Sequence, residues 1–217
     1  SSATSSPANC WSECGRRRAV SRGRTRAVGT RHAFAPLFPI AIVSEYEAIV
    51  YDLDGTLVRL DVDWDAVAAR CGAVLRARDV EAAGASIWEM RERAAENDLL
   101  ERVDETIAEF EREGARSASR LPLADELPRD EAVGVCSLNA SAACRIALEL
   151  HGLDGHVGTV VGRDSVETVK PDPEPLLAAV EALGATPERT LFIGDSDTDE
   201  IAAQRAGTEF EWVADRV

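Results

Sequence analysis

Lysine is almost absent from this 217-residue chain. Lys170 is the only lysine among 24 basic residues, which leaves 23 arginines (24 − 1). An ammonium is a compact point charge and a guanidinium is a flat fork, so a site built for one does not suit the other. Two interpretations of Lys170 are therefore open: one surviving lysine codon in an arginine-biased sequence, or a cation with a specific task.

Metal-binding patterns of cysteine and histidine are also lacking. The five cysteines include no C-x-x-C pair, and the three histidines do not cluster with them. This excludes the usual zinc-site patterns. Cys71, Cys136 and Cys144 each lie in apolar surroundings, so we expect them to be small buried hydrophobic residues. Nothing in this pattern requires an oxidising compartment, and we expect a cytoplasmic protein.

The first 44 residues lack any helical or strand period. They hold seven arginines and one acidic residue, a net charge of +6. We predict a disordered or extended N-terminal segment over residues 1–44. Its paired arginines leave a twin-arginine export signal open, but the apolar run that follows is eleven residues long and contains two prolines. That run is also too short to cross a bilayer, so we expect no membrane partner.

Positive charge is scarce in the rest of the chain. Residues 45–217 hold 17 basic (24 − 7) and 38 acidic (39 − 1) residues, a net charge of −21. A body this acidic repels nucleic acid unless the charge is locally reversed, so no nucleic-acid partner is expected. Excess acid together with scarce lysine is also the composition of a salt-adapted, halophilic protein.

From Tyr46 onward, short apolar runs alternate with helical patterns. Strands are predicted at Ala48–Leu53, Ala132–Ser137, Val157–Gly162, Thr190–Asp195 and Glu209–Ala214. Helices are predicted at Ser141–Leu150, Pro175–Leu183 and Thr198–Ala206, each followed by a glycine that can end it. This alternation predicts an α/β fold with a doubly wound parallel sheet.

Residues 59–121 interrupt the alternation and contain only helical patterns. Trp64, Val67, Cys71 and Leu75 recur at helical spacing as an apolar stripe, and Ser86 with Glu89 matches a capping box. We therefore expect a small all-helical subdomain at 59–121, inserted into a core formed by 45–58 and 122–217.

Acidic pairs follow two of the predicted strands. Asp52 and Asp54 end the first strand, and Asp195 ends another, with Asp199 in the first turn of the next helix. Open α/β sheets bind ligands at the carboxyl ends of their strands. Clustered carboxylates with no histidine or cysteine nearby indicate Mg²⁺. Each pair alone is also compatible with a turn or helix-cap role.

Together these segments resemble the haloacid dehalogenase superfamily. The resemblance lies in DLDGT at 52–56, a strand ending in Ser137, Lys170 before Pro171, and GDSDTD at 194–199, in that order. It implies a hydrolase with a Rossmann-like core, similar to the phosphoglycolate phosphatase-like members. The helical insert matches the position of the family's first-type cap.

The resemblance implies a Mg²⁺-dependent phosphatase that acts on a small phosphorylated metabolite. Asp52 would attack phosphorus to form an aspartyl-phosphate, and Asp54 would serve as general acid and then base. Ser137, Lys170, Gly55 and Thr56 would bind the phosphate. Mg²⁺ would be held by Asp52, Asp54 (through its backbone carbonyl), Asp195 and Asp199.

The superfamily also includes enzymes that catalyse other reactions, and the sequence argues against two of these. Asp54 argues against a dehalogenase, and the lysine-free insert excludes the phosphonate-cleaving reaction that uses a cap lysine. A phosphomutase and a catalytically weak phosphate-binding regulatory module stay open, as does the choice between a monomer and a homodimer.

Overall fold

The computed structural model describes residues 45–216. The predicted N-terminal segment 1–44 lies outside the described residues. No helix within 45–216 is long and apolar enough to cross a membrane.

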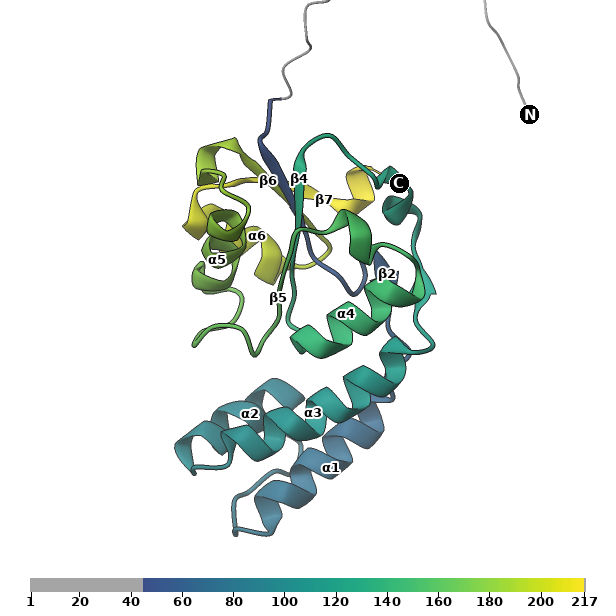
Figure 1. The fold of residues 1–217 in the computed structure, drawn as a ribbon. Helices are drawn as coiled ribbons and strands as arrows, with labels where there is room; N and C mark the ends of the chain where they lie inside the picture. The colour runs from purple at the N-terminus through teal and green to yellow at the C-terminus, as the bar shows by residue number, and fades with distance from the viewer. Residues whose placement is uncertain (1–44, 217) are drawn as a thin grey trace, which may run out of the picture. The chain divides into compact units, whose positions relative to one another are not determined.

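A five-stranded parallel sheet forms the centre of the core (Figure 1). Its strand order is β5-β4-β1-β6-β7. The strands are β1 (Ala48–Tyr51), β4 (Ala132–Cys136), β5 (Thr159–Val161), β6 (Thr190–Gly194) and β7 (Glu209–Trp212). Strand β1 lies in the middle and pairs with β4 on one side and β6 on the other. All five predicted strands are present, each one to three residues shorter than its apolar run.

Helices cover both faces of this sheet. Helices α5 (Glu174–Ala182) and α6 (Asp197–Ala206) pack on one face, and α4 (Ser141–Leu150) packs on the other. Short 3-10 turns complete the core at Pro122–Glu126, Asp154–His156, Pro187–Arg189 and Val213–Asp215. The predicted doubly wound parallel sheet is confirmed.

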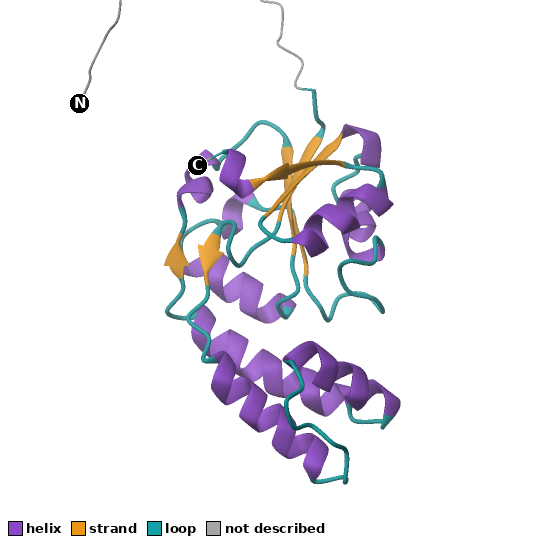
Figure 2. Ribbon diagram, turned by 180° about the vertical axis from the view of Figure 1, so that it is seen from behind, coloured by secondary structure: helices purple, strands orange, loops and turns teal. Residues whose placement is uncertain are grey.

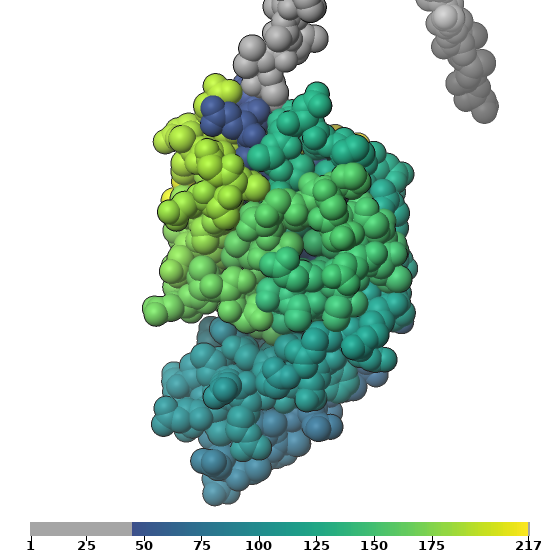
Figure 3. Space-filling model, in the orientation of Figure 1, coloured from purple at the N-terminus to yellow at the C-terminus, as the bar shows by residue number. Residues whose placement is uncertain are grey.

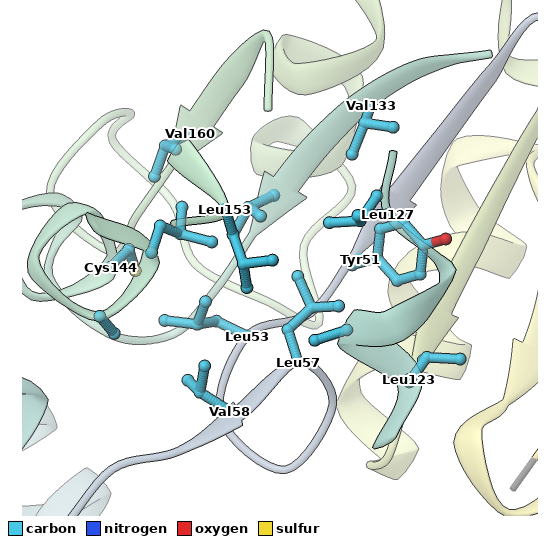
Figure 4. Close-up of a cluster of buried hydrophobic side chains, with 14 of the residues drawn as sticks. Tyr51, Leu53, Leu57, Val58, Leu123, Leu127, Val133, Cys144, Leu153 and Val160 are labelled. Atoms are coloured by element: carbon cyan, nitrogen blue, oxygen red, sulfur yellow. The ribbon is translucent and has the colours of Figure 1, made fainter. Parts of the chain in front are cut away.

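Alternation of side chains along β1 explains the two layers. Ile49 and Tyr51 point to the face that carries α4, whereas Val50 joins the cluster beneath α5 and α6. Successive residues of a strand point to opposite faces, so a strand buried on both sides must be apolar throughout. Figure 4 shows the first cluster, in which Tyr51 lies among leucines and Cys144 approaches from α4.

Three helices follow the first strand and enclose a separate apolar cluster. They are α1 (Trp64–Arg76), α2 (Ile87–Glu96) and α3 (Leu100–Ala115). Val67, Cys71, Leu75, Val103 and Ile107 are buried between them. The capping box predicted at the start of α2 is present, with Ser86 accepting from the Glu89 N–H and Glu89 accepting from the Ser86 N–H.

Two features of the helical insert differ from the sequence prediction. The expectation that 59–121 contains no strand is wrong at its ends, where β2 (Val58–Arg59) and β3 (Ser119–Arg120) pair antiparallel. Figure 2 shows this ribbon where the chain passes between the core and the three helices. Trp64 begins the predicted apolar stripe of α1, yet it is 42% exposed, because it lies at the helix end that faces the core.

Candidate active site

Four segments bring polar side chains together beyond the carboxyl ends of the strands. Asp52 follows β1, Ser137 follows β4 and Asp195 follows β6. The loop between β5 and α5 supplies Lys170. All four side chains line one cavity of about 310 Å³. Parallel strands place their carboxyl ends at the same edge of the sheet, so segments distant in the sequence meet there.

Lys170 is the centre of the hydrogen-bond network in this cavity. Its Nζ donates to Asp52 Oδ1 at 2.8 Å, to the Cys136 carbonyl at 2.9 Å and to Asp199 Oδ1 at 2.5 Å. It also lies 5.4 Å from the centre of the Phe192 ring. Three protons therefore meet three acceptors, while the side chain is only 2% exposed. The two carboxylates raise the pKa of Lys170 above its ordinary value, although burial alone would lower it.

The two carboxyl groups of the DLDGT segment occupy different environments. Burial raises the pKa of Asp52, and nearby Asp199 adds to this, while Lys170 opposes it. Asp54 is half-buried and lines the same cavity, and its Oδ1 accepts the Leu60 N–H at 3.0 Å. Burial also raises the pKa of Asp54, and the Leu60 hydrogen bond opposes the shift. Asp52 therefore has a fixed cation beside it, whereas Asp54 has a backbone donor.

Oxygen ligands for a cation converge on the same point. Carboxylate oxygens of Asp52, Asp195 and Asp199 all lie within 4.8 Å of one another. Burial raises the pKa of Asp195, and Asp199 reinforces this shift. Such crowded like charges are stabilised by a cation, and an all-oxygen set suits Mg²⁺. The residues present therefore fit this ion.

Asp199 differs from the other carboxylates because both of its oxygens have protein partners. Oδ1 accepts from Lys170, and Oδ2 accepts from the backbone and hydroxyl of Ser196 as part of a capping box on α6. The carboxylate packs against Gly194, where a Cβ would lie 2.6 Å from it. Asp199 thus orients Lys170 whether or not it also binds a cation.

Gly55 and Thr56 were predicted to bind phosphate, and neither is among the residues that line the cavity. Gly55 has φ +95°, and a Cβ there would lie 2.0 Å from Asp195 Oδ2. The glycine therefore allows the turn after β1 to approach Asp195 closely. Thr56 is fully buried, and its Oγ1 has no hydrogen-bond partner. Phosphate binding by these two residues stays a prediction.

A buried ion pair links the three helices to the loop that follows β4 and carries Ser137. Glu111 of α3 is 1% exposed, and its two oxygens accept from Arg163 at 2.8 and 3.1 Å. The same carboxylate accepts from Asn139 Nδ2 at 3.2 Å and from the Ala140 N–H at 2.9 Å. Asn139 in turn exchanges two hydrogen bonds with Ser137. Glu111 therefore fixes the loop that carries Ser137.

Sequence reasoning missed several residues of this site. Trp64, Trp88 and Glu111 line the cavity but lie in the helical insert, far from every motif. One signal was available for Glu111: it is an acid one turn after Ile107 on the apolar side of α3. Asn139 also lines the cavity, and its side chain lies between Ser137 and Glu111.

The arginines of the insert do not reach the cavity. Residues 59–121 hold ten arginines, and none of them lines the cavity. Of the six between positions 70 and 102, four are exposed and two are half-buried; they are Arg70, Arg76, Arg78 and Arg102, and Arg91 and Arg93. Arg91 instead forms a bidentate pair with Asp104 at 2.7 and 3.0 Å.

Comparison with known proteins identifies the family. Residues 46–207 match the model of the haloacid dehalogenase-like hydrolases. The match includes all four predicted motifs, and the resemblance seen in the sequence is confirmed.

A similar curated protein is the pyrophosphatase PpaX of Bacillus cereus (strain B4264), with 37% identity over 109 residues. The match covers 50% of this chain and 43% of that protein, so the chain spans less than half the length of this relative.

Two solved structures share the fold. A hydrolase from Pseudomonas syringae has 26% identity and a TM-score of 0.58, covering 76% of this chain and 82% of that one. A putative phosphoglycolate phosphatase from Lactobacillus plantarum has 23% identity and a TM-score of 0.55, covering 78% and 86%.

Proposed function

Because the chain belongs to the haloacid dehalogenase-like hydrolases, we propose that it is a phosphatase that transfers the phosphoryl group of a small phosphate ester to Asp52 and then to water. The observation that carries the proposal is the position of Asp52. Asp52 directly follows β1, and its carboxylate faces a cavity of about 310 Å³ and accepts a hydrogen bond from Lys170 at 2.8 Å.

The first step would form a bond between an Asp52 oxygen and phosphorus while the bond to the leaving oxygen breaks. A carboxylate can form such a covalent intermediate. Lys170 holds Asp52 on one side and would offset the charge of the phosphoryl oxygens, together with the Ser137 hydroxyl. A preorganised cation in a buried site stabilises such charge more strongly than it would in water.

Asp54 would transfer the protons. A carboxyl group with a raised pKa can remain protonated long enough to donate to a leaving alkoxide. Once it has lost that proton, it becomes the base for the water that attacks the aspartyl-phosphate. Its half-buried position in the same cavity supports both roles.

A bound Mg²⁺ would neutralise the carboxylates and the phosphoryl oxygens. Asp52, Asp195 and the Asp54 backbone carbonyl are the proposed ligands, with Asp199 direct or through water. The three helices α1–α3 would act as the cap, because Trp64 and Trp88 from this unit line the cavity opposite the strand ends. The substrate would be a small phosphorylated metabolite.

Hydrolysis of p-nitrophenyl phosphate tests the proposal. We expect turnover with Mg²⁺, loss of turnover with a chelator, and loss of at least about 10³-fold in Asp52→Asn, since that change removes the nucleophile. Asp197→Asn is the matched control, because Asp197 is an exposed acid next to the site. Turnover by Asp52→Asn within tenfold of the unmodified protein would contradict the assignment. Release of one inorganic phosphate per nitrophenol distinguishes a phosphatase from a phosphomutase.

A further inference from the structure

The part of the substrate beyond the phosphate would meet an apolar surface. A second cavity of about 270 Å³ adjoins the first and shares Trp64, Trp88 and Glu111 with it. Ile87 and Ile107 complete its lining. A cavity of about 150 Å³ lined by apolar side chains holds a benzene molecule, so this space is large enough for one ring.

The two tryptophans are exposed although they are large and apolar. Trp64 is 42% exposed and Trp88 is 43% exposed, and both face the cavities from the ends of α1 and α2. Exposed aromatic residues at a cavity that is rimmed by polar groups mark a binding surface. Figure 3 shows these helices, in blue and teal, directly below the core.

Charge restricts what can lie on this surface. Among the described residues that line either cavity, Lys170 is the sole cation, and it already donates to Asp52, Asp199 and Cys136. The facing acids are Asp52, Asp54, Asp195 and Glu111. Arg163 lines neither cavity, and its guanidinium is occupied by Glu111, Asp104 and the Leu138 carbonyl. Arg59 acts electrostatically on Asp54 and Asp195, but it too lines neither cavity. A second anionic group on the substrate would thus be desolvated without a partner, which is costly.

From this combination we infer that the preferred substrate is a phosphate monoester whose leaving group is neutral and carries a flat apolar ring, which packs on Trp64 and Trp88. The inference rests on the proposed phosphatase function. Esters with a second anionic group, such as phosphoglycolate, are poor substrates because Lys170, the one cation among the residues that line the cavities, already has three acceptors. The specificity would therefore come from the helical insert rather than from the motifs of the core.

Three substrates with the same phosphate test this specificity. 2-Phenylethyl phosphate and ethyl phosphate have leaving alcohols of similar acidity, so a difference in kcat/KM between them measures recognition of the ring. We expect the phenylethyl ester to be favoured on the order of 10- to 100-fold, the effect of burying one apolar ring. Phosphoglycolate should be turned over no faster than ethyl phosphate.

A tryptophan variant locates the effect. Trp88→Ala should bring the ratio of the two kcat/KM values towards one, because the ring loses its aromatic partner. Leu177→Ala is the control: Leu177 is another exposed apolar residue, on α5 and outside both cavities, and its removal should keep the ratio. An equal rate for the two esters, or phosphoglycolate as the best substrate, would overturn the inference.

Binding of phosphonates separates this inference from the proposed function. Calorimetry with Mg²⁺ compares 2-phenylethylphosphonate with ethylphosphonate, neither of which is hydrolysed. Tighter binding of the ring compound that is lost in Trp88→Ala, in a protein that hydrolyses no ester, would refute the phosphatase and retain the ring site. Turnover of ethyl phosphate without any preference for the ring in either assay would retain the phosphatase and refute the ring site.

Discussion

At the scale of single residues, the three hydrogen bonds of Lys170 explain why this position is a lysine in a chain that otherwise has 23 arginines (24 − 1). Each proton of its ammonium meets one acceptor, and the acceptors belong to Asp52 directly after β1, Cys136 of β4 and Asp199 of α6. A guanidinium is wider and flat, and it cannot place its donors at three converging points. The geometry of the three acceptors therefore favours an ammonium at this position, and a chance survival of one lysine codon would not require such a geometry.

Lys170→Arg tests that selection. We expect turnover to fall by about 10²-fold or more, the scale observed when one preorganised charge-stabilising group is lost. Lys170 is 4% exposed, so the site leaves little room for a larger side chain. Overpacking should therefore lower the free energy of unfolding by about 1–3 kcal/mol. Stopped assays and urea denaturation measure the two effects.

A conservative swap elsewhere provides the comparison for this variant. Arg145→Lys lies on the exposed side of α4 and should change neither quantity measurably. Near-normal turnover in Lys170→Arg would favour the interpretation that Lys170 is one surviving lysine codon. It would also weaken the proposed roles of its hydrogen-bond partners.

The sequence predicted the residues with short-range signatures and missed the rest. Asp52, Asp54 and Asp195 follow recognisable strands, so their convergence could be predicted before the fold was known. Trp64 was predicted as part of the core because its spacing is helical, and spacing cannot distinguish a core residue from one at a cavity. The partnership of Glu111 with Arg163 depends on how α3 docks, which no local pattern encodes.

At the scale of the elements, α3 connects the helical insert to the core through one buried carboxylate. Glu111 receives four hydrogen bonds, from Arg163, Asn139 and Ala140. A buried ion pair is costly to break because the remaining charge is left without a partner. The position of the loop carrying Ser137 therefore depends on a residue of the insert.

Glu111→Gln should destabilise the protein by about 3 kcal/mol, because buried Arg163 loses its closest ion-pair partner and keeps only the longer pair with Asp104, at 3.5 Å. Urea denaturation measures this change. Glu113→Gln, on the exposed side of the same helix, should have little effect, because its pair with Arg116 is solvent-exposed. Replacing both Glu111 and Arg163 by methionine should cost less than Glu111→Gln alone. Equal, small effects at positions 111 and 113 would show that this link does not stabilise the docking of α3.

Helices and strands were predictable where their hydrophobic patterns extended over enough residues. Helix α4 was predicted at its observed bounds, and α5 and α6 within one residue. The paired β2 and β3 have two residues each, too few for a period to be seen. The predicted strands included the polar residues that directly follow the apolar runs, such as Asp52 and Ser137, but in the structure these residues turn into the site.

At the scale of the whole molecule, the surplus of negative charge dominates. Residues 45–217 carry a net charge of −21, which destabilises a compact state by self-repulsion. Added salt shortens the Debye length from about 10 Å at 0.1 M to about 3 Å at 1 M. We therefore expect the melting temperature to rise as KCl increases over this range, as in a salt-adapted protein.

Neutralising exposed acids gives the control for the salt effect. A variant with Glu96, Glu109 and Glu149 changed to glutamine removes three exposed charges outside the active-site cavity. It should show a shallower rise in melting temperature with KCl. A melting temperature that falls with salt would mean that the attraction within ion pairs outweighs the net repulsion.

The central claim is that Asp52 carries the phosphoryl group, and direct capture of that group tests it. Asp54→Asn should still accept phosphate from p-nitrophenyl phosphate, whose leaving group needs no acid, but should lack the base for hydrolysis. Rapid quenching with Mg²⁺ present, followed by borohydride reduction and mass spectrometry, should locate a homoserine at position 52. Release of nitrophenol without any modification at that position would contradict the account.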